Sequence, residues 1–458
     1  MKSLFSTFFV LFFLVFTINA QEEELEMESI EMDEMDMIEI PNDEAPKAYS
    51  IKGYPTNFSI VGEGFYLRAK VNERHYGNFS FNKGGKPMPL VFPDSLSNPY
   101  IKAEFKDWVY FIATVSKSYS GLYKYHPKTG QFVFLKKLSM GSVGVLVPFV
   151  VLNDKLYFTA KSPDAGTELW QCDGTSEGTF MLSNVSKYKS DRFKDLILYN
   201  GRLYFYNNYK LFVSEGKPGD TKEVVFENPV KYMHIAALCP SDKGLFISTS
   251  GSGKYLYLLD DKSLEAKQVK AWPDVDSMRE LLPQAIGDKV YFTLEDPTSK
   301  KHIIWESNGS EKGTKSISAK FGDFQNVLHL TAIGDNLFFS AQEGQSTNPW
   351  CYNPKRKKAF KLASTSSSTK SKLAYNFMGE GNKVFFISDF SPNRLLWTTD
   401  GSPEGTYVLK EERSKGELNE MIIYQGKLYF SFNKEGSYER ELWVSDGTKE
   451  GTALYHDF

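Results

Sequence analysis

The chain has 458 residues, which is enough for one large repeated domain or for several small ones. With 54 basic and 57 acidic residues, its formal net charge of −3 argues against a nucleic-acid-binding protein. Cys172, Cys239 and Cys351 form no CxxC and have no nearby histidine, which excludes a disulfide framework and a cysteine-based zinc site. We expect buried thiols, with at most one bridge.

Residues 1–20 have the features of a secretory signal peptide. Lys2 gives a basic start, residues 4–16 are apolar, and Ile18-Asn19-Ala20 is a plausible cleavage site. A membrane anchor is the alternative, but the apolar run is too short for a full span and acidic residues follow it. We therefore expect a secreted, extracellular protein whose mature form has no membrane span.

Residues 21–46 form an acidic segment with twelve Asp and Glu and no Lys or Arg. Such a segment repels itself, so we expect it to be disordered. Without Lys2 and these twelve acids the chain has 53 basic against 45 acidic residues, so residues 47–458 are basic. The acidic segment could shield residues 47–458 or bind a basic partner. It could equally be a tail that only keeps the protein soluble.

A short apolar string that follows a turn recurs nine times. Its clear copies include NDKLYFTA, GDKVYFTL and QGKLYFSF, and the central residues are 41 to 47 positions apart. These residues are Tyr66, Tyr110, Tyr157, Tyr204, Leu245, Tyr291, Phe338, Phe385 and Tyr429. A period near 46 in segments rich in Tyr, Phe, Val and Thr, with turns every ten residues or so, predicts repeated four-stranded units and excludes helical repeats.

A second string follows the first in four of these units. It reads ELWQCDGTSEGT (168–179), IIWESNGSEKGT (303–314), LLWTTDGSPEGT (395–406) and ELWVSDGTKEGT (441–452), with a worn copy at 211–221. Its repeated positions are Trp170, Asp173, Gly174, Trp305, Gly309, Trp397, Asp400, Gly401, Trp443, Asp446 and Gly447.

Four-stranded antiparallel units at this period are typical of β-propeller blades. We predict an all-β fold in which residues 47–458 form a single propeller of nine repeats. Nine blades are favoured because the chain ends where the ninth unit ends, and the first blade would close the ring on the ninth. Eight is the alternative, since propellers typically have four to eight blades and the first unit is the weakest.

The last unit explains the second string physically. Its third strand is apolar on both faces because neighbouring blades cover both, so we expect the four tryptophans to be buried between blades. Asp446 would cap the turn with its carboxylate and Gly447 would supply a positive φ, with a second such position at Gly451. Calcium binding by Asp173, Asp400 and Asp446 is the weaker alternative, because each loop offers one carboxylate.

These strings resemble the ELWxxDGT repeat, a family of secreted and surface proteins, mostly bacterial. The resemblance covers residues from about 55 to 458; four units match well and five keep only the turn and apolar string. It implies propeller blades in which the repeat residues are scaffold. It implies no activity, because the motif does not define one.

The functional prediction is a secreted, non-catalytic binding or extracellular-matrix module that presents loops of one propeller face to a protein or glycan. The alternative is an extracellular glycan hydrolase or lyase at the channel mouth, which a cluster of Asp, Glu or His there would favour. No catalytic, cofactor or metal motif is recognisable, and the oligomeric state is open. Candidate N-glycosylation sequons lie at Asn57, Asn78, Asn184 and Asn308.

Overall fold

The computed structural model divides into two units, Met1–Glu39 and Ile40–Phe458, and every described residue lies in the second. It describes residues 56–456, except for 62–63, 71–75, 82–87, 91–95, 115–118, 140–148, 163–165, 187–192, 208, 276–278, 297, 318–325, 345, 364–373, 391–392, 413–419 and 434–439. The predicted signal peptide, the acidic segment and the first residues of the predicted propeller, 47–55, lie outside the described residues.

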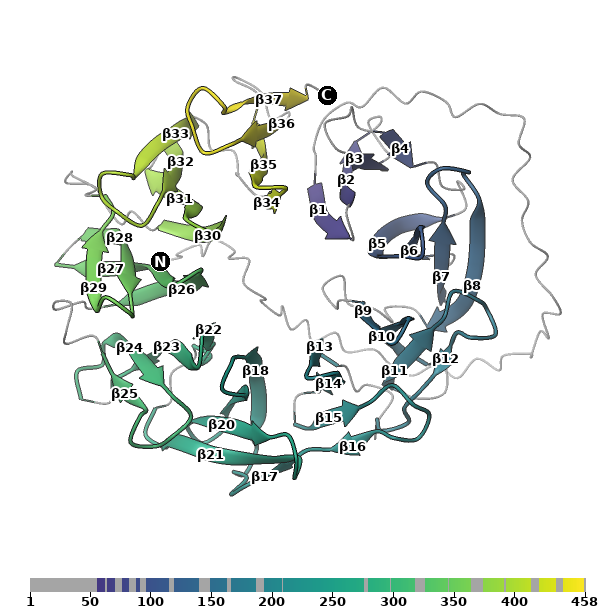
Figure 1. Ribbon diagram of the computed structural model, residues 1–458, viewed down its shortest axis with the longest axis horizontal. Coiled ribbons are helices and arrows are strands. Elements are labelled where there is room, and N and C mark those ends of the chain that lie inside the picture. The colour runs from purple at the N-terminus through teal and green to yellow at the C-terminus, as the bar shows by residue number, and fades with distance from the viewer. Residues whose placement is uncertain are drawn as a thin grey trace, which may run out of the picture. The chain divides into compact units, whose positions relative to one another are not determined.

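The second unit is an all-β propeller of nine blades, and each blade contains four antiparallel strands in chain order (Figure 1). This confirms the predicted fold and the favoured blade count.

The strands fall into four sets by their place in the blade. The first strands are β1 (Thr56–Val61), β5 (Ser97–Phe105), β9 (Val150–Leu152), β13 (Asp195–Tyr199), β18 (His234–Pro240), β22 (Gln284–Ile286), β26 (Val327–Ile333), β30 (Ala374–Glu380) and β34 (Met421–Tyr424). The second strands are β2 (Gly64–Lys70), β6 (Trp108–Thr114), β10 (Lys155–Lys161), β14 (Arg202–Tyr206), β19 (Leu245–Ser250), β23 (Lys289–Glu295), β27 (Asn336–Glu343), β31 (Lys383–Phe390) and β35 (Lys427–Asn433).

The outer half of each blade holds the third and fourth strands. The third strands are β3 (Tyr76–Phe81), β7 (Tyr119–Tyr125), β11 (Thr167–Cys172), β15 (Leu211–Ser214), β20 (Lys254–Asp260), β24 (His302–Ser307), β28 (Ser346–Asn353), β32 (Asn393–Thr399) and β36 (Arg440–Ser445). The fourth strands are β4 (Met88–Leu90), β8 (Phe132–Ser139), β12 (Phe180–Met181), β16 (Lys222–Glu223), β21 (Glu265–Trp272), β25 (Lys315–Ser316), β29 (Lys358–Lys361), β33 (Tyr407–Glu412) and β37 (Ala453–His456).

Blade 5 departs from the four-strand expectation. A short strand, β17 (Val225–Phe226), pairs in parallel with β21, so this sheet has five strands. The chain that leaves blade 4 therefore follows the outer edge of blade 5 before it crosses to β18, as Figure 1 shows.

The first strands line the axis of the ring, where those of most neighbouring blades contact one another. The second strands are buried on both faces, as predicted. In β10, Tyr157 packs into an apolar cluster shared with blade 4, while its neighbour Phe158 packs into a cluster shared with blade 2. The alternation of side chains along a strand thus gives each blade two apolar faces, one for each neighbour.

The ring closes by side-chain packing, because blades 1 and 9 are each built from one continuous stretch of chain. Phe65 of β2 lies between Tyr424 and Tyr429 of blade 9, with ring centroids 5.8 and 5.0 Å apart. Blade 1, the weakest repeat in sequence, is thus part of the ring. In the part of the chain that the structure describes, no helix is long and apolar enough to span a membrane.

Candidate functional site

The antiparallel blades give the propeller two different faces. We call the hairpin face the one formed by the turns between first and second strands and between third and fourth strands. The connection face holds the turns between second and third strands and the segments that lead from each blade to the next. Every DGT-type string lies on the hairpin face, because it joins a third strand to a fourth.

The hairpin turn of blade 9 is held together by its own polar groups. The backbone N–H and the hydroxyl of Thr448 both donate to Asp446 Oδ1, at 2.9 and 2.7 Å, and Gly447 has a φ of 92°. These two hydrogen bonds from Thr448 lower the pKa of the Asp446 carboxyl. The carboxylate therefore caps the turn, as predicted. Among the described residues, no cluster of three or more His, Cys, Asp or Glu could hold a metal ion.

Gly451 is required for a reason other than the predicted one. Its φ lies outside the left-handed region, but a Cβ at this position would overlap the Asp446 carboxylate. Its N–H also donates to Thr448 Oγ1 at 2.9 Å. The prediction of a second positive φ was wrong, and the glycine instead leaves room for the cap. The equivalent pairs are Gly178 with Asp173, Gly313 with Asn308, and Gly405 with Asp400.

Two further hydroxyls complete the turn and were not identified from the sequence. Ser445 Oγ and Thr452 Oγ1 lie 2.7 Å apart, and Gly447 N–H donates to Ser445 Oγ at 3.1 Å. The same arrangement recurs at Thr399 with Thr406 and at Ser307 with Thr314, each pair 2.7 Å apart. Every close copy of the string ends in threonine, and this constant residue is the feature of the sequence that could have predicted the hydroxyl pair.

The glycine carbonyl of this turn also joins neighbouring blades. Tyr407 of blade 8 donates its hydroxyl to Gly447 O at 2.8 Å, and Lys124 of blade 2 donates to Gly174 O at 2.7 Å. In blade 4, whose repeat is worn, Gly216 O accepts from Tyr157 of blade 3 at 3.1 Å. The polar groups of the hairpin face are therefore used within the scaffold.

The tryptophans are less buried than expected. Trp170 is 5 % exposed, but Trp305, Trp397 and Trp443 are only partly buried. Each pairs across its blade with a phenylalanine of the second strand, as Trp397 does with Phe386, whose rings stack 5.7 Å apart. Their place toward the outer edge of the blade leaves part of three of the rings in solvent.

The predicted modification sites and cysteines differ in exposure. Asn78 is buried within β3 and has no room for a glycan in the folded chain, whereas Asn184 and Asn308 are exposed. The side chain of Asn57 lies outside the described set. The three cysteines are free and buried, as expected. Burial raises the pKa of the Cys239 and Cys351 thiols to about 12.

Titratable groups gather on the connection face over blades 6 and 7. Arg279 precedes β22, and the Nε2 atom of His302 lies 4.0 Å from an Oε atom of Glu295. Burial, followed by the charge of Arg279, lowers the pKa of His302 and also that of His329, to about 4 for the latter. Both imidazoles are thus neutral at pH 7 and lie within electrostatic range of one arginine.

His329 lies in a distorted part of its strand. Its φ is 56°, and it sits in a bulge of β26 where the register with β27 shifts between Leu328 and Thr331. Its ring is 6.3 Å from that of Tyr375 in β30. The same bulge recurs in blade 8, where Asn376 of β30 has a φ of 52°, so the distortion at His329 is a repeated feature of the first strands.

A second polar group lies on the same face over blade 4. Burial raises the pKa of the Asp195 carboxyl at the start of β13. Burial and then the charges of Asp195 and Glu280 raise the pKa of the Tyr206 hydroxyl, which donates to Ala236 O at 3.3 Å. Two carboxyl groups therefore lie within electrostatic range of one phenol.

Exposed aromatic side chains also mark the connection face, between blades 4 and 5. Tyr209 is 55 % exposed and Tyr232 is 72 % exposed. The ring of Tyr209 lies 4.9 Å from that of His234, centroid to centroid. We call Tyr209, Tyr232 and His234 the aromatic patch.

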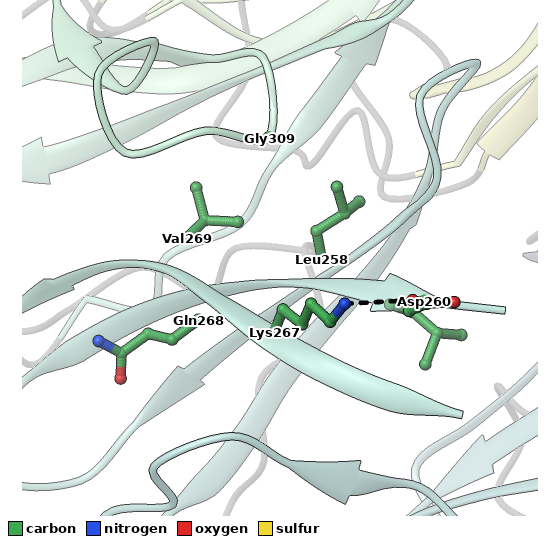
Figure 2. A pocket seen from close by; sticks show the side chains of 7 residues that line it. Leu258, Asp260, Lys267, Gln268, Val269 and Gly309 are labelled. Atoms are coloured by element: carbon green, nitrogen blue, oxygen red, sulfur yellow. Dashed lines mark hydrogen bonds and ion pairs between the residues drawn. The ribbon is translucent and has the colours of Figure 1, made fainter. Parts of the chain in front are cut away.

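A cavity of about 290 Å³ lies on the hairpin face between blades 5 and 6 (Figure 2). Leu258, Val269 and Gly309 line it, and Figure 2 shows Lys267 reaching Asp260 at its side, at 3.2 Å. The leucine contacts the turn at Gly309 closely enough to exclude a Cβ there. The charged groups of the lining, Lys267 and Asp260, pair with each other. We therefore interpret the cavity as a gap in the packing between two blades.

No family model and no curated protein matches the chain, so membership of the ELWxxDGT family stays a prediction. Solved structures that are similar include the β-propeller domain of the Trilobed protease from Pyrococcus furiosus, at 12 % identity and a TM-score of 0.38, with 80 % of this chain and 98 % of that chain covered.

A puromycin-hydrolysing peptidase from Mycobacterium tuberculosis matches at 11 % identity and a TM-score of 0.42, covering 86 % of this chain and 58 % of that one. A prolyl endopeptidase matches at 10 % identity and a TM-score of 0.41, covering 86 % and 54 %. The chain spans little more than half of these two peptidases, and likeness at this level supports no inference about function.

Proposed function

We propose that this protein is a secreted, non-catalytic binding module that presents the connection face of its propeller to an extracellular ligand. The observation that carries the proposal is that the two most exposed aromatic side chains of the described residues, Tyr209 and Tyr232, both lie on the connection face. The polar groups of the hairpin turns are used within and between blades, whereas the connection face exposes the rings of Tyr209 and Tyr232. Exposed aromatic rings in fixed positions are typical of binding surfaces.

A binding screen with matched variants tests this proposal. The protein would be screened against arrays of extracellular glycans and purified matrix proteins, beside a Tyr209→Ala/Tyr232→Ala variant. Leu454→Ser is the control, because Leu454 is a 42 % exposed apolar residue on the outer strand β37. We expect a ligand that the control binds and the double variant does not. Equal binding by all three would contradict the proposal.

Secretion is the part of the proposal that rests on sequence alone. Expression of the full chain in a secreting host should yield material that begins after residue 20, as N-terminal sequencing would show. Material that begins at Met1, or that stays inside the cell, would contradict it.

Catalysis on a glycan is a second candidate, favoured by the grouping of Asp195, Tyr206 and Glu280. Burial raises the pKa of the Asp195 carboxyl, and Asp195 and Glu280 both act electrostatically on Tyr206; glycoside hydrolases likewise use two carboxyl groups, one of them with a raised pKa. A panel of polysaccharides would be assayed for new reducing ends and for the ultraviolet absorbance of lyase products. Activity that Asp195→Asn and Glu280→Gln both abolish would favour this candidate over the binding module.

A further inference from the structure

A tight turn holds the backbone that carries Tyr209. Asn207 Oδ1 accepts hydrogen bonds from the N–H groups of Tyr209 and Lys210, both at 2.9 Å, and Asn207 N–H donates to Lys210 O at 3.1 Å. The ring packs against that of His234 at the start of β18, with centroids 4.9 Å apart. Little conformational freedom of the backbone remains to be lost when a ligand covers this ring.

A second turn presents Tyr232 in left-handed backbone. Met233 N–H donates to Val230 O at 3.2 Å, and the φ of Tyr232 is 59°. The turn lies directly on Gly251 of blade 5, where a Cβ would come within 3.3 Å of Tyr232 O. A bulky side chain in this conformation is strained, yet its ring is 72 % exposed, so folding gains little from its presence.

The charges beside the two rings differ in how they are satisfied. Lys210 pairs with Glu223 at 2.6 Å. Lys231 Nζ lies 4.9 Å from the centre of the Tyr232 ring, and the ion pairs within the described ranges give it no carboxylate partner. The cation next to Tyr232 is thus available to an anionic ligand.

The size of the patch favours a ligand built of small rings. Tyr232 is two residues before His234, so the Cα atoms of these two residues are at most about 7 Å apart, and the ring of His234 contacts that of Tyr209. Lys231 places a positive charge beside the ring of Tyr232. A protein partner would instead need a continuous interface of about 1,000 Å² or more with an apolar centre.

We propose that the aromatic patch binds an acidic oligosaccharide. Sugar rings stack with their C–H faces on Tyr209 and Tyr232, and a carboxylate or sulfate of the same chain pairs with Lys231. The positive C–H groups of a sugar face are attracted to the negative face of an aromatic ring, and the hydroxyls at its rim remain in water. The inference rests on the proposed function and assigns its ligand class.

The experiment measures binding of three oligosaccharides of equal length by calorimetry: an oligogalacturonate, a heparin-derived oligosaccharide and a dextran oligosaccharide. We expect at least one acidic probe to bind, and Tyr209→Ala to weaken it at least about tenfold. Lys231→Met should remove most of the salt dependence of this binding. The better of the two acidic probes identifies the anionic group as a carboxylate or a sulfate.

Tyr232→Gly separates a binding role from a folding role. Glycine relieves the left-handed strain, so this variant should melt at the same or a higher temperature while it loses the acidic probe. Leu454→Ser is the control and should bind normally.

Three outcomes would overturn the inference. They are equal binding of dextran and the acidic probes, undiminished binding by Tyr232→Gly, and binding of none of the three probes. A matrix protein whose binding depends on the aromatic patch would overturn the glycan assignment alone and leave the proposed function standing. Binding that none of the connection-face variants changes would overturn both.

Discussion

The two faces of this propeller differ in how their polar and aromatic groups are used. On the hairpin face, Gly447 takes the positive φ, and the groups around it are consumed by hydrogen bonds to Asp446, Ser445 and the neighbouring blade. On the connection face, His329 and Tyr232 take positive φ without the freedom of glycine, and Tyr232 is largely exposed. Non-glycine residues take a positive φ on both faces, as Asn153 does in a hairpin turn, so the two faces differ in hydrogen bonding and in exposure of aromatic rings, not in backbone strain.

The largest expected effect is on the scaffold, at Trp170. Trp170→Ala should lower the free energy of unfolding by about 3–5 kcal/mol, because the ring is 5 % exposed and its Nε1 donates to Ala160 O at 3.0 Å. Trp443→Ala should cost about 2 kcal/mol, because that ring is only partly buried. Chemical denaturation measures both, and equal losses would contradict the difference in burial.

Gly451→Ala should destabilise by about 2 kcal/mol, since its methyl group would overlap the Asp446 carboxylate. Asp446→Ala should cost about 1 kcal/mol through the lost cap. In the double variant the alanine at 451 should cost much less than it does alone, because the clashing group is gone. A double-mutant cycle by denaturation checks this, and additive losses would mean that the glycine has another role.

The aromatic patch should behave in the opposite way. Tyr209→Ala/Tyr232→Ala should change the free energy of unfolding by no more than about 0.5 kcal/mol, because both rings are mostly in solvent. Thermal and chemical denaturation would measure this beside the wild type. A loss comparable with that at Trp443 would make the patch part of the scaffold.

The smallest effect concerns Asp195 and depends on pH. Burial raises its pKa in the folded state, so its contribution to stability is fully present below the unfolded pKa and is lost as pH rises through the folded one. Asp195→Asn should therefore be more stable than the wild type at neutral pH, with a difference that disappears in acid. Denaturation curves across pH test this, and a difference that grows toward acid would contradict the assignment.

The scaffold was readable from sequence because its causes are local and repeated. Each second strand is a short apolar run after a turn, as Tyr157 and Phe158 show, and its spacing counts the blades. Gly451 was misread because its cause is a contact with a residue five positions earlier. The burial of Trp443 was overestimated because it depends on how the outer strands cover the ring, which the string does not encode.

The candidate site was not readable, because nothing in the sequence distinguishes a tyrosine in a loop from one in the core. Tyr209 lies in blade 4 and Tyr232 precedes β18 of blade 5, and the contact between these regions is the ring of His234 against that of Tyr209. The extra strand β17, which leads the chain along blade 5 toward Tyr232, could not be predicted either, because it pairs with β21 through only two residues. The Asn-Pro pair before Val230 was the available signal for a turn there.

A paired measurement on one variant from each face tests the central claim most directly. Tyr232→Gly and Gly451→Ala would each be measured for melting temperature and for affinity to the best-binding acidic oligosaccharide. The account predicts that Tyr232→Gly loses affinity and keeps its melting temperature, while Gly451→Ala melts at a lower temperature and keeps its affinity. The reverse pattern, or a loss of both properties in both variants, would contradict the division between a structural hairpin face and a binding connection face.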